Sequence, residues 1–475
     1  MKARTRLTGL AVTLALAFVL AGPSRAADAV PVGDWQGTLQ GILRLVFHFH
    51  RGESGQLKGT MDSPDQGATG IRLASVVLEG DSLHFDVPSI RGLFAGRVAS
   101  DGDSISGRWM QAGMSLPLVM RRGAADSTRR RPQEPAKPYP YDETEVRVEN
   151  RGAGITLAGT LSTPRGAGRF PCAVLITGSG PEDRDETVFG HRPFLVLADH
   201  LTRQGIAVLR MDDRGVGAST GRFAGSTSAD FADDIRAGVD FLARHERIDP
   251  KRIGLIGHSE GGVIAPLVSD QGARLAFMVL LAGPGLRGDS LLQLQSIALR
   301  RAAGLPDSLI ARGAMYNRRL YERIIAGDSL GALEMVRALV REEIGQIPGD
   351  NRGATGDPER MASELLGTIY TPWMRFLLGY DASQGLARAK CPILAIWGDR
   401  DLQVPWRENR EAMASALEKA RHRDHTLRVV EGLNHMFQSC KTCTIGEYMQ
   451  LEETMAPVVL AEISDWIQVR TRAKR

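Results

Sequence analysis

The chain has 475 residues, long enough for about three domains, and 43% of them are hydrophobic and 24% charged. This balance is ordinary for a globular protein and too apolar for a disordered one. The formal net charge is +4, but the first 26 residues hold four basic residues and no acidic one. The remaining chain has 55 basic and 55 acidic residues, so charge gives no support to a nucleic-acid or anionic-membrane partner.

Residues 1–26 have the pattern of a secretory signal peptide. Three basic residues within the first six precede an apolar run over 7–21, and small residues follow at Ser24 and Ala26. The apolar run is shorter than the roughly 20 residues that a membrane-spanning helix needs. We therefore expect a cleaved leader, no membrane span, and an exported protein that is periplasmic or secreted.

Residues 30–121 are predicted to form an antiparallel β meander or small barrel. Apolar and polar residues alternate between Leu43 and His50, and turns rich in Gly, Asp and Ser separate the later runs. These later runs cover 71–78, 82–87, 93–98 and 104–110. His48 shares a strand face with His50, and we expect a polar surface there in preference to a metal site.

Residues 122–142 are rich in proline and arginine and predict a stiff, extended linker. We expect its basic run, Arg129 to Arg131, to be solvated. Of the four cysteines, Cys440 and Cys443 have the spacing of a local disulfide, and an exported chain allows one. The other two cysteines open apolar runs and are expected to be buried thiols.

From residue 143 onward, apolar runs alternate with helical patterns, which predicts an α/β domain whose parallel sheet is covered on both faces. The strand-like runs are 173–177, 206–211, 253–257, 277–281, 393–398 and 427–430. Residues 286–386 are helical with no intervening strand, as expected of a lid inserted into the domain. The catalytic domain is thus expected to comprise residues 143–285 and 387–475.

A Gly-x-Ser-x-Gly motif occurs three times, centred on Ser219, Ser259 and Ser329. A nucleophile elbow requires a buried strand directly before the serine and a helix directly after it. Only Ser259 has both, because the other two lie after a polar loop and between helical segments. We therefore identify Ser259 as the candidate nucleophile and expect His258 to support the site without reacting.

A serine hydroxyl needs a general base, and in this arrangement the triad runs serine, acid, histidine along the chain. Asp401 follows the first strand after the predicted lid, and His435 follows the last strand. Asp399 competes for the acid position. We prefer Asp401, because a carboxylate at the very end of the strand points away from the loop that reaches His435.

The oxyanion of acyl transfer needs hydrogen-bond donors. One is expected to be the backbone N–H of Glu260, which follows the nucleophile. The second is expected to be the backbone N–H of Ser179, in the glycine-rich loop after the first long parallel strand. A phosphate-binding interpretation of that loop fails, because no Gly-Lys-Ser/Thr follows.

These motifs resemble the α/β-hydrolase superfamily from about residue 143 to the C-terminus, and within it the bacterial carboxylesterases near the cinnamoyl esterase and serine aminopeptidase branches. The resemblance rests on the segments 178–185, 213–217, 257–262 and 401–405. It implies an eight-stranded, mostly parallel sheet, no cofactor or metal, and ester hydrolysis through an acyl-enzyme. By the same likeness Asp401 matches the acid and Ser179 the oxyanion residue. Many relatives carry His-Gly where this chain has Thr177-Gly178, which leaves the geometry of this loop open.

The sequence thus favours a carboxylic ester hydrolase acting on a small-molecule ester. A peptidase, thioesterase or amidase of the same fold stays open, as does a binding protein that has lost catalysis. The aromatic and apolar residues of the predicted lid, among them Trp373, could line an acyl pocket. We expect them instead to pack the lid onto the core.

Overall fold

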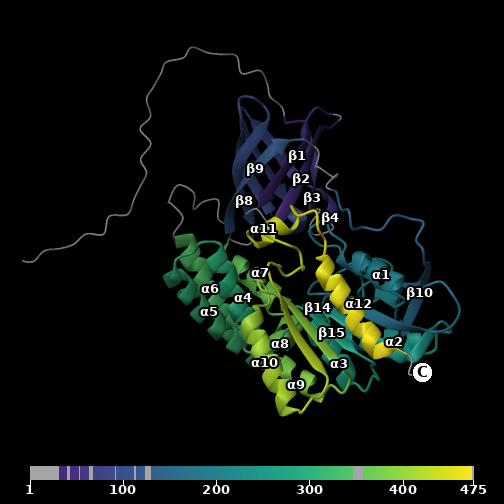
Figure 1. Cartoon of the computed structure of the whole chain (residues 1–475). Helices are drawn as coiled ribbons and strands as arrows, with labels where there is room; N and C mark the ends of the chain where they lie inside the picture. The colour runs from purple at the N-terminus through teal and green to yellow at the C-terminus, as the bar shows by residue number, and fades with distance from the viewer. Residues whose placement is uncertain are drawn as a thin grey trace, which may run out of the picture.

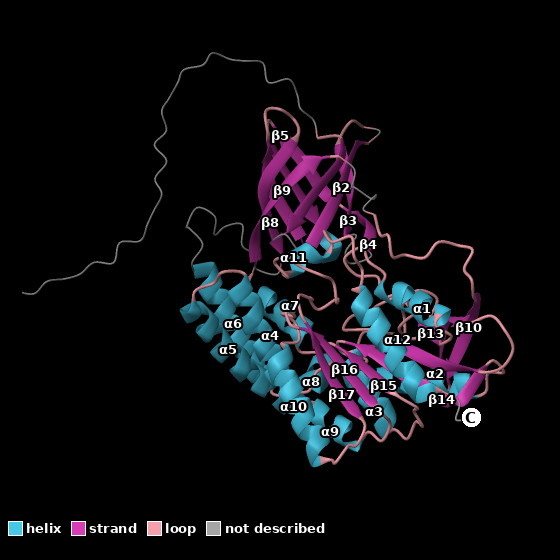
Figure 2. Ribbon diagram, in the orientation of Figure 1, coloured by secondary structure: helices cyan, strands magenta, loops and turns pink. Residues whose placement is uncertain are grey.

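The computed structural model describes residues 31–39, 43–52, 54–63, 68–90, 92–111, 114–123, 130–345 and 357–472. The predicted signal peptide and Arg129 lie outside these ranges. An antiparallel barrel-like sheet comes first along the chain, and a mixed sheet covered by helices follows it (Figure 1; Figure 2). Among the helices that the structure describes, none is both long and apolar enough to cross a membrane.

The N-terminal sheet has nine strands in the order β4-β3-β2-β1-β9-β8-β7-β6-β5. The strands are β1 (Gly33–Leu39), β2 (Leu43–Arg51), β3 (Leu57–Ser63), β4 (Ala68–Arg72), β5 (Ala74–Glu79), β6 (Ser82–Val87), β7 (Gly92–Val98), β8 (Ser104–Gln111) and β9 (Met114–Arg122). All neighbouring strands are antiparallel, as predicted. Six aromatic rings are buried inside the sheet: Trp35, Phe47, Phe49, Phe85, Phe94 and Trp109.

The apolar run 71–78 is part of two strands, not of the single strand that its pattern predicted. β4 pairs with β3, whereas β5 pairs with β6, so the chain passes from one end of the strand order to the other at Leu73. The partly buried positions change from odd to even numbers at this crossing, where Ser75 has a φ of 51°. This change of phase marks the crossing in the sequence.

His48 lies on the outer side of β2, between two carboxylates. Its Nδ1 is 2.7 Å from Asp34 Oδ1 and its Nε2 is 3.1 Å from Asp62 Oδ2. Both ring nitrogens are therefore engaged by side chains of the same surface. Within the described ranges, no group of three or more His, Cys, Asp or Glu side chains is arranged to hold a metal ion.

The second sheet has eight strands in the order β10-β11-β13-β12-β14-β15-β16-β17. They are β10 (Asp142–Asn150), β11 (Ile155–Thr163), β12 (Phe170–Ile176), β13 (Ala207–Met211), β14 (Ile248–His258), β15 (Met278–Leu281), β16 (Ile393–Gly398) and β17 (His425–Val430). From β13 to β17 all pairs are parallel, while β10 and β11 are antiparallel to their neighbours. The six predicted strands and the mostly parallel sheet are confirmed.

The chain reverses its direction of travel across the sheet at β12. From β12 it runs to β13 on one side, and it then returns to β14 on the other. In open parallel sheets, ligand sites form beyond the carboxyl ends of the strands at such a point. The loops after β12 and β14 carry Ser179 and Ser259, so the topology places both predicted site loops side by side.

Helices cover both faces of this sheet. One face holds α1 (Pro193–Arg203) and α12 (Pro457–Thr471), and the other holds α2 (Ser228–Ala243), α3 (Gly261–Asp270) and α10 (Trp406–Lys419). The strands between them are almost continuously buried, which explains why they read as unbroken apolar runs.

The predicted lid consists of helices where the structure describes it. They are α4 (Gly288–Ala302), α5 (Asp307–Ala326), α6 (Ser329–Gly345), α7 (Pro358–Ile369), α8 (Pro372–Gly379) and α9 (Ala382–Arg388). α5, α6, α7 and α8 share a small apolar core of their own, which includes Ile324, Val336 and Leu378. These helices therefore form a separate packing unit between β15 and β16.

The cysteines follow the sequence prediction. Cys440 and Cys443 form a disulfide, and Cys172 and Cys391 are buried free thiols. The disulfide closes a turn in the loop after His435, before the short helix α11 (Ile445–Tyr448).

The prediction that the basic run of the linker is solvated is wrong for Arg131. Its guanidinium donates hydrogen bonds to the carbonyl oxygens of Gly190 (2.8 Å), Leu451 (2.6 Å) and Met449 (3.0 Å). Gln133 pairs with the backbone of Met455 as well. The linker is thus docked on the catalytic domain, because a planar guanidinium can satisfy several carbonyls at once.

We predict that Arg131→Ala releases this docked segment. Carbonyl oxygens that lose their donor cost on the order of 1–3 kcal/mol where they are buried. The segment 130–142 should then be cut several-fold faster than in wild type by a non-specific protease. Arg130→Ala removes the same charge from an exposed neighbour and is the control, expected to behave as wild type. Equal cleavage rates for Arg131→Ala and wild type would contradict the docking.

Candidate active site

Ser259 occupies the turn between strand β14 and helix α3. Its φ is 53°, in the left-handed region that costs a residue other than glycine about 1–3 kcal/mol. Its N–H donates to the carbonyl of Leu281 on the neighbouring strand, at 2.9 Å. The strained turn is therefore held from one side by the sheet.

Glycines make this turn sterically feasible. A Cβ on Gly257 would lie 2.1 Å from the carbonyl oxygen of Gly261, and one on Gly261 would lie 2.3 Å from that of Ile176. Both contacts involve backbone atoms that cannot move aside. The two glycines of the motif thus allow helix α3 to begin directly against strands β12 and β14.

The other two serine motifs have different surroundings. Ser219 is buried, its Oγ donates to the carbonyl of Asp212 at 2.8 Å, and it accepts from the N–H of Ala158 at 2.9 Å. This hydroxyl ties a loop to β11. Ser329 is exposed at the first turn of α6 in the lid. Neither serine lies on a strand-to-helix turn.

Asp401 and His435 are brought together by the structure. The Nδ1 of His435 is 2.8 Å from Oδ2 of Asp401, and the Asp401 side chain is completely buried. The other carboxylate oxygen accepts the N–H groups of Gln403 (2.7 Å) and Val404 (2.9 Å). Three hydrogen bonds therefore fix this carboxylate, and it in turn orients the imidazole.

Asp399, the competing acid, faces the turn after β17 instead. Its Oδ1 accepts the N–H of Gly432 at 2.6 Å. It therefore caps a loop and has no hydrogen bond to His435 in the structure.

The structure describes no hydrogen bond between Ser259 and the imidazole of His435. Ser259 and His435 are nevertheless close, because His258, which directly precedes Ser259, contacts His435. The rings of His258 and His435 have centroids 4.8 Å apart, and Nε2 of His258 lies 3.1 Å from the carbonyl oxygen of His435. The elbow and the histidine loop thus adjoin at the carboxyl edge of the sheet.

The loop after β12 lies against the elbow. A Cβ on Gly178 would be 3.5 Å from the Cβ of Ser259, which shows how close the two loops come. The N–H of Gly178 donates to Oε1 of Glu186, whereas no protein acceptor is described for the N–H of Ser179 or of Glu260. Glu260 lies at the N-terminus of α3, where N–H groups lack partners within the helix.

The side chain of Glu260 is a feature that the sequence analysis missed. Its Oε1 accepts hydrogen bonds from Ser228 Oγ (2.6 Å) and from the indole N–H of Trp373 (2.8 Å). Burial raises the pKa of this carboxyl, while hydrogen bonds from Ser228, Trp373 and Ser179 lower it in part. One carboxyl thus joins the elbow, the loop of Ser179 and the lid.

Trp373 has a more definite role than the packing that we expected. It lies on α8, and its hydrogen bond to Glu260 crosses from the lid to the elbow. Met374, the next residue, packs in the lid's own core and not onto the core of the catalytic domain. A glutamate directly after the nucleophile was the one sequence signal that could have indicated such a partner.

A cavity of about 20 Å³ lies behind the loop of Ser179, bordered by Gly178, Asp213 and Phe231 among others. This volume has room for about one water molecule. Burial raises the pKa of Asp213 to about 7, and hydrogen bonds from the Glu182 backbone and Thr177 oppose that rise.

Comparisons with known proteins find similarity to hydrolases in part of the chain. A model of the family described as serine aminopeptidase, S33 (Hydrolase_4), matches residues 192–325. Esterase EstD of Thermotoga maritima is 30% identical over 167 residues, which are 34% of this chain. The matched part spans only 38% of EstD.

Solved structures with similar folds include esterases and a peptidase. Est1E from Butyrivibrio proteoclasticus, with ferulic acid bound, is 17% identical; the match covers 69% of this chain and 100% of Est1E, with a TM-score of 0.40. The Pyrococcus furiosus esterase Pf2001 is 16% identical, with coverages of 74% and 100% and a TM-score of 0.42. A puromycin-hydrolyzing peptidase of Mycobacterium tuberculosis is 17% identical, with coverages of 90% and 54% and a TM-score of 0.45.

Similarity at that level carries no information about substrate. The sequence matches show which proteins the chain is similar to, and the mostly parallel eight-stranded sheet shows its fold. This chain has the α/β-hydrolase fold, and parts of its sequence are similar to an esterase and to the S33 serine aminopeptidase family.

Proposed function

We propose that the chain is a serine hydrolase that cleaves small carboxylic esters through an acyl-enzyme. Ser259 is the nucleophile, His435 the general base, and Asp401 the acid that orients the histidine. The backbone N–H groups of Ser179 and Glu260 form the oxyanion hole. The reaction needs no cofactor.

The observation that carries this proposal is the buried pair of Asp401 and His435 beside a strained serine turn. The carboxylate fixes a proton on Nδ1 of the imidazole, at 2.8 Å. The other ring nitrogen, Nε2, is then unprotonated and can accept the proton of a serine hydroxyl. A backbone strained to a φ of 53° costs stability, and such strain beside a buried acid–histidine pair is typical of a catalytic site.

The steps follow from this arrangement. Oγ of Ser259 attacks the ester carbonyl while its proton passes to Nε2 of His435, and the oxyanion binds the two N–H groups, each worth about 3 kcal/mol. The C–O bond to the alcohol then breaks, and His435 returns the proton to the leaving oxygen. Water, deprotonated by His435, hydrolyses the acyl-serine and restores the free enzyme.

An ester is favoured over an amide by the match to an esterase, EstD. The family model described as a serine aminopeptidase supports the alternative of an aminoacyl amide substrate. The two differ in leaving group, so a panel of p-nitrophenyl esters and aminoacyl anilides separates them. We expect short esters to be cleaved faster, and a clear preference for anilides would replace the esterase with a peptidase.

We predict that Ser259→Ala abolishes both ester cleavage and labelling by a fluorophosphonate probe. The probe reacts only with an activated serine, and this replacement removes the hydroxyl. Ser329→Ala and Ser219→Ala are the matched controls from the other two motifs. Ser329→Ala should label as wild type does, and Ser219→Ala should label wherever it folds. Labelling that persists in Ser259→Ala would refute the assignment.

We predict that Asp401→Asn lowers kcat by a factor of about 10³–10⁴. The amide oxygen keeps the bonds to the N–H groups of Gln403 and Val404, so its NH₂ faces His435 and forces the proton onto Nε2. That imidazole cannot accept the serine proton. Asp399→Asn, which retains an acceptor for Gly432, is the control and should cost less than about tenfold. A similar loss in both variants would contradict the choice of acid.

We also propose that the chain is exported and that its leader is removed after Ala26. The composition of residues 1–26 supports this, and so does the disulfide between Cys440 and Cys443, a bond that persists mainly in oxidising compartments. Protein recovered from the periplasm or medium of an expressing bacterium should begin at Ala27 on N-terminal sequencing. Cytoplasmic protein that retains Lys2 would contradict the proposal.

A further inference from the structure

His258 lies between two hydrogen-bond acceptors. Its Nδ1 is 2.8 Å from Oε1 of Glu186, and its Nε2 is 3.1 Å from the carbonyl oxygen of His435. The ring of His258 is buried, and so is the carboxylate of Glu186. Water is therefore largely excluded from both bonds.

The two bonds restrict where the protons lie. A carbonyl oxygen only accepts, so Nε2 of His258 must carry a proton. The second bond then needs a proton either on Nδ1, giving an imidazolium and a carboxylate, or on Glu186. Burial by itself lowers the pKa of His258, but the charge and hydrogen bond of Glu186 outweigh it and raise the pKa, which favours the ion pair.

Glu186 also binds the loop of the oxyanion hole. The same Oε1 that faces His258 accepts the N–H of Gly178, at 3.1 Å. This bond fixes the peptide unit immediately before Ser179. A continuous path of hydrogen bonds thus runs from Gly178 through Glu186 and His258 to the backbone of His435.

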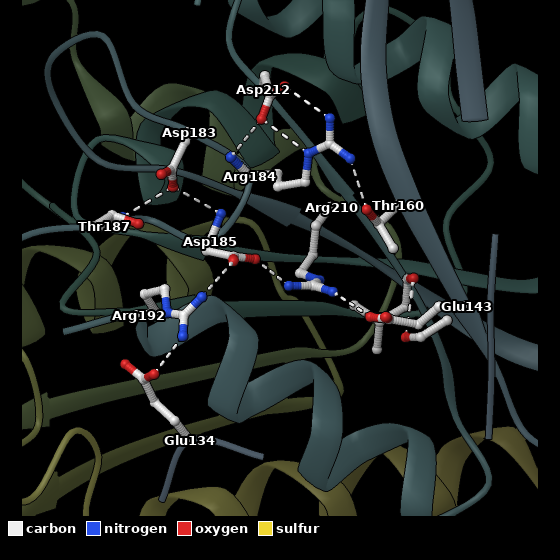
Figure 3. A network of polar contacts seen from close by, with 12 residues as sticks. Glu134, Glu143, Thr160, Asp183, Arg184, Asp185, Thr187, Arg192, Arg210 and Asp212 are labelled. Carbon is white, nitrogen blue, oxygen red and sulfur yellow. Dashed lines mark hydrogen bonds and ion pairs between the residues drawn. The ribbon is translucent and has the colours of Figure 1, made fainter. Parts of the chain in front are cut away.

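The residues on either side of Glu186 in the sequence are anchored by polar contacts, which Figure 3 shows for 183–185 and Thr187. Two nitrogens of the Arg184 guanidinium donate hydrogen bonds to the carboxylate of Asp212, at 3.0 and 2.8 Å, and Asp185 pairs with Arg210. Asp183 accepts the N–H groups of Asp185 (3.0 Å) and Thr187 (3.1 Å). Since Glu186 has a φ of 54°, these anchors on both sides keep a strained residue in position.

We propose that Glu186 and His258 are positioning residues that hold the oxyanion loop in register with the loop of the general base. The inference rests on the proposed function of Ser259 and His435. Neither residue touches the reacting atoms; they act through the backbones of Gly178 and His435. A displacement of about 1 Å between the oxyanion donors and the base can cost a factor of about 100 in rate.

The test compares four variants in the full-length protein. Glu186→Ala removes both bonds of the carboxylate, and His258→Phe keeps a ring but removes both of its bonds. Both bonds of Glu186 reach the same oxygen, so Glu186→Gln can replace only one of them: its amide oxygen accepts the N–H of Gly178, or its NH₂ donates to an unprotonated Nδ1 of His258. Thr202→Val is the matched control, because it deletes a buried hydroxyl bonded to Ser162 at 2.8 Å, away from the site loops.

The readouts are kcat and KM for a p-nitrophenyl ester, the rate of Ser259 labelling by a fluorophosphonate, and the thermal midpoint. We expect Glu186→Ala and His258→Phe to lower kcat and the labelling rate by about 10- to 100-fold, with KM changed less than about threefold. Glu186→Gln keeps one of the two bonds and should recover part of the loss. A fifth variant that combines Glu186→Ala with His258→Phe should be no slower than the worse of the two single variants, because both residues act through one path.

Several outcomes would overturn the inference. A fall in thermal midpoint with unchanged kcat, as expected for Thr202→Val, would make the pair merely structural. Glu186→Gln as slow as Glu186→Ala would exclude positioning by hydrogen bonds. If Glu186→Ala does not fold, Glu186→Asp replaces it, since a shorter carboxylate cannot reach both partners. Ester cleavage that survives in Ser259→Ala would instead refute the proposed function. This result can be told apart from a failure of the positioning inference, in which Ser259→Ala is inactive and the Glu186 and His258 variants keep the wild-type kcat.

Discussion

The close approach of three backbones at the elbow is the constraint on which the rest of the site depends. Strand β14 must turn into α3 within a few residues, and α3 must begin against the end of β12. Gly257 and Gly261 are the residues that permit this, because a Cβ on either would overlap a backbone atom. Once the backbones are this close, Ser259 is forced to a positive φ, and the loop after β12 must pass directly beside it.

Because the backbones are so close, Glu260 can contribute both its backbone N–H and its side chain to this region. The backbone N–H of Glu260 lies at the helix N-terminus, while its carboxyl reaches Ser228 and Trp373. A buried carboxyl is stable only where donors surround it, and the donors here come from α2 and from the lid. The lid is therefore attached to the elbow itself, and not only to the apolar core, so the position of the lid and the geometry of the proposed oxyanion hole are linked.

Residue patterns were sufficient to predict the parallel strands and the elbow. Strands β12 to β16 are buried on both faces and therefore appear in the sequence as apolar runs. The spacing of Gly257, Ser259 and Gly261 predicts a tight turn between a strand and a helix. Strands β10 and β11 were not predicted. β10 is an edge strand, and an exposed edge tolerates charged residues such as Glu145 and Arg147. β11 is buried, but its threonines and serine interrupt the apolar pattern. The pairing of Asp401 with His435 was predictable only from chain order. The partners of Glu186 and Arg131 were not, since they lie far away along the chain and no local pattern encodes a contact between loops.

The acids around the oxyanion loop raise a question of charge. Glu182, Asp213 and Glu260 all lie close to residues 177–180, and three anions there would repel the negative charge that develops on the substrate oxygen. Burial raises the pKa of each of the three, so the loop carries less negative charge than its composition suggests. Glu186 faces the imidazole of His258, which can balance the charge of a carboxylate. The arrangement thus keeps acidic side chains as hydrogen-bond acceptors for the loop while limiting the field that they exert on the reacting carbonyl.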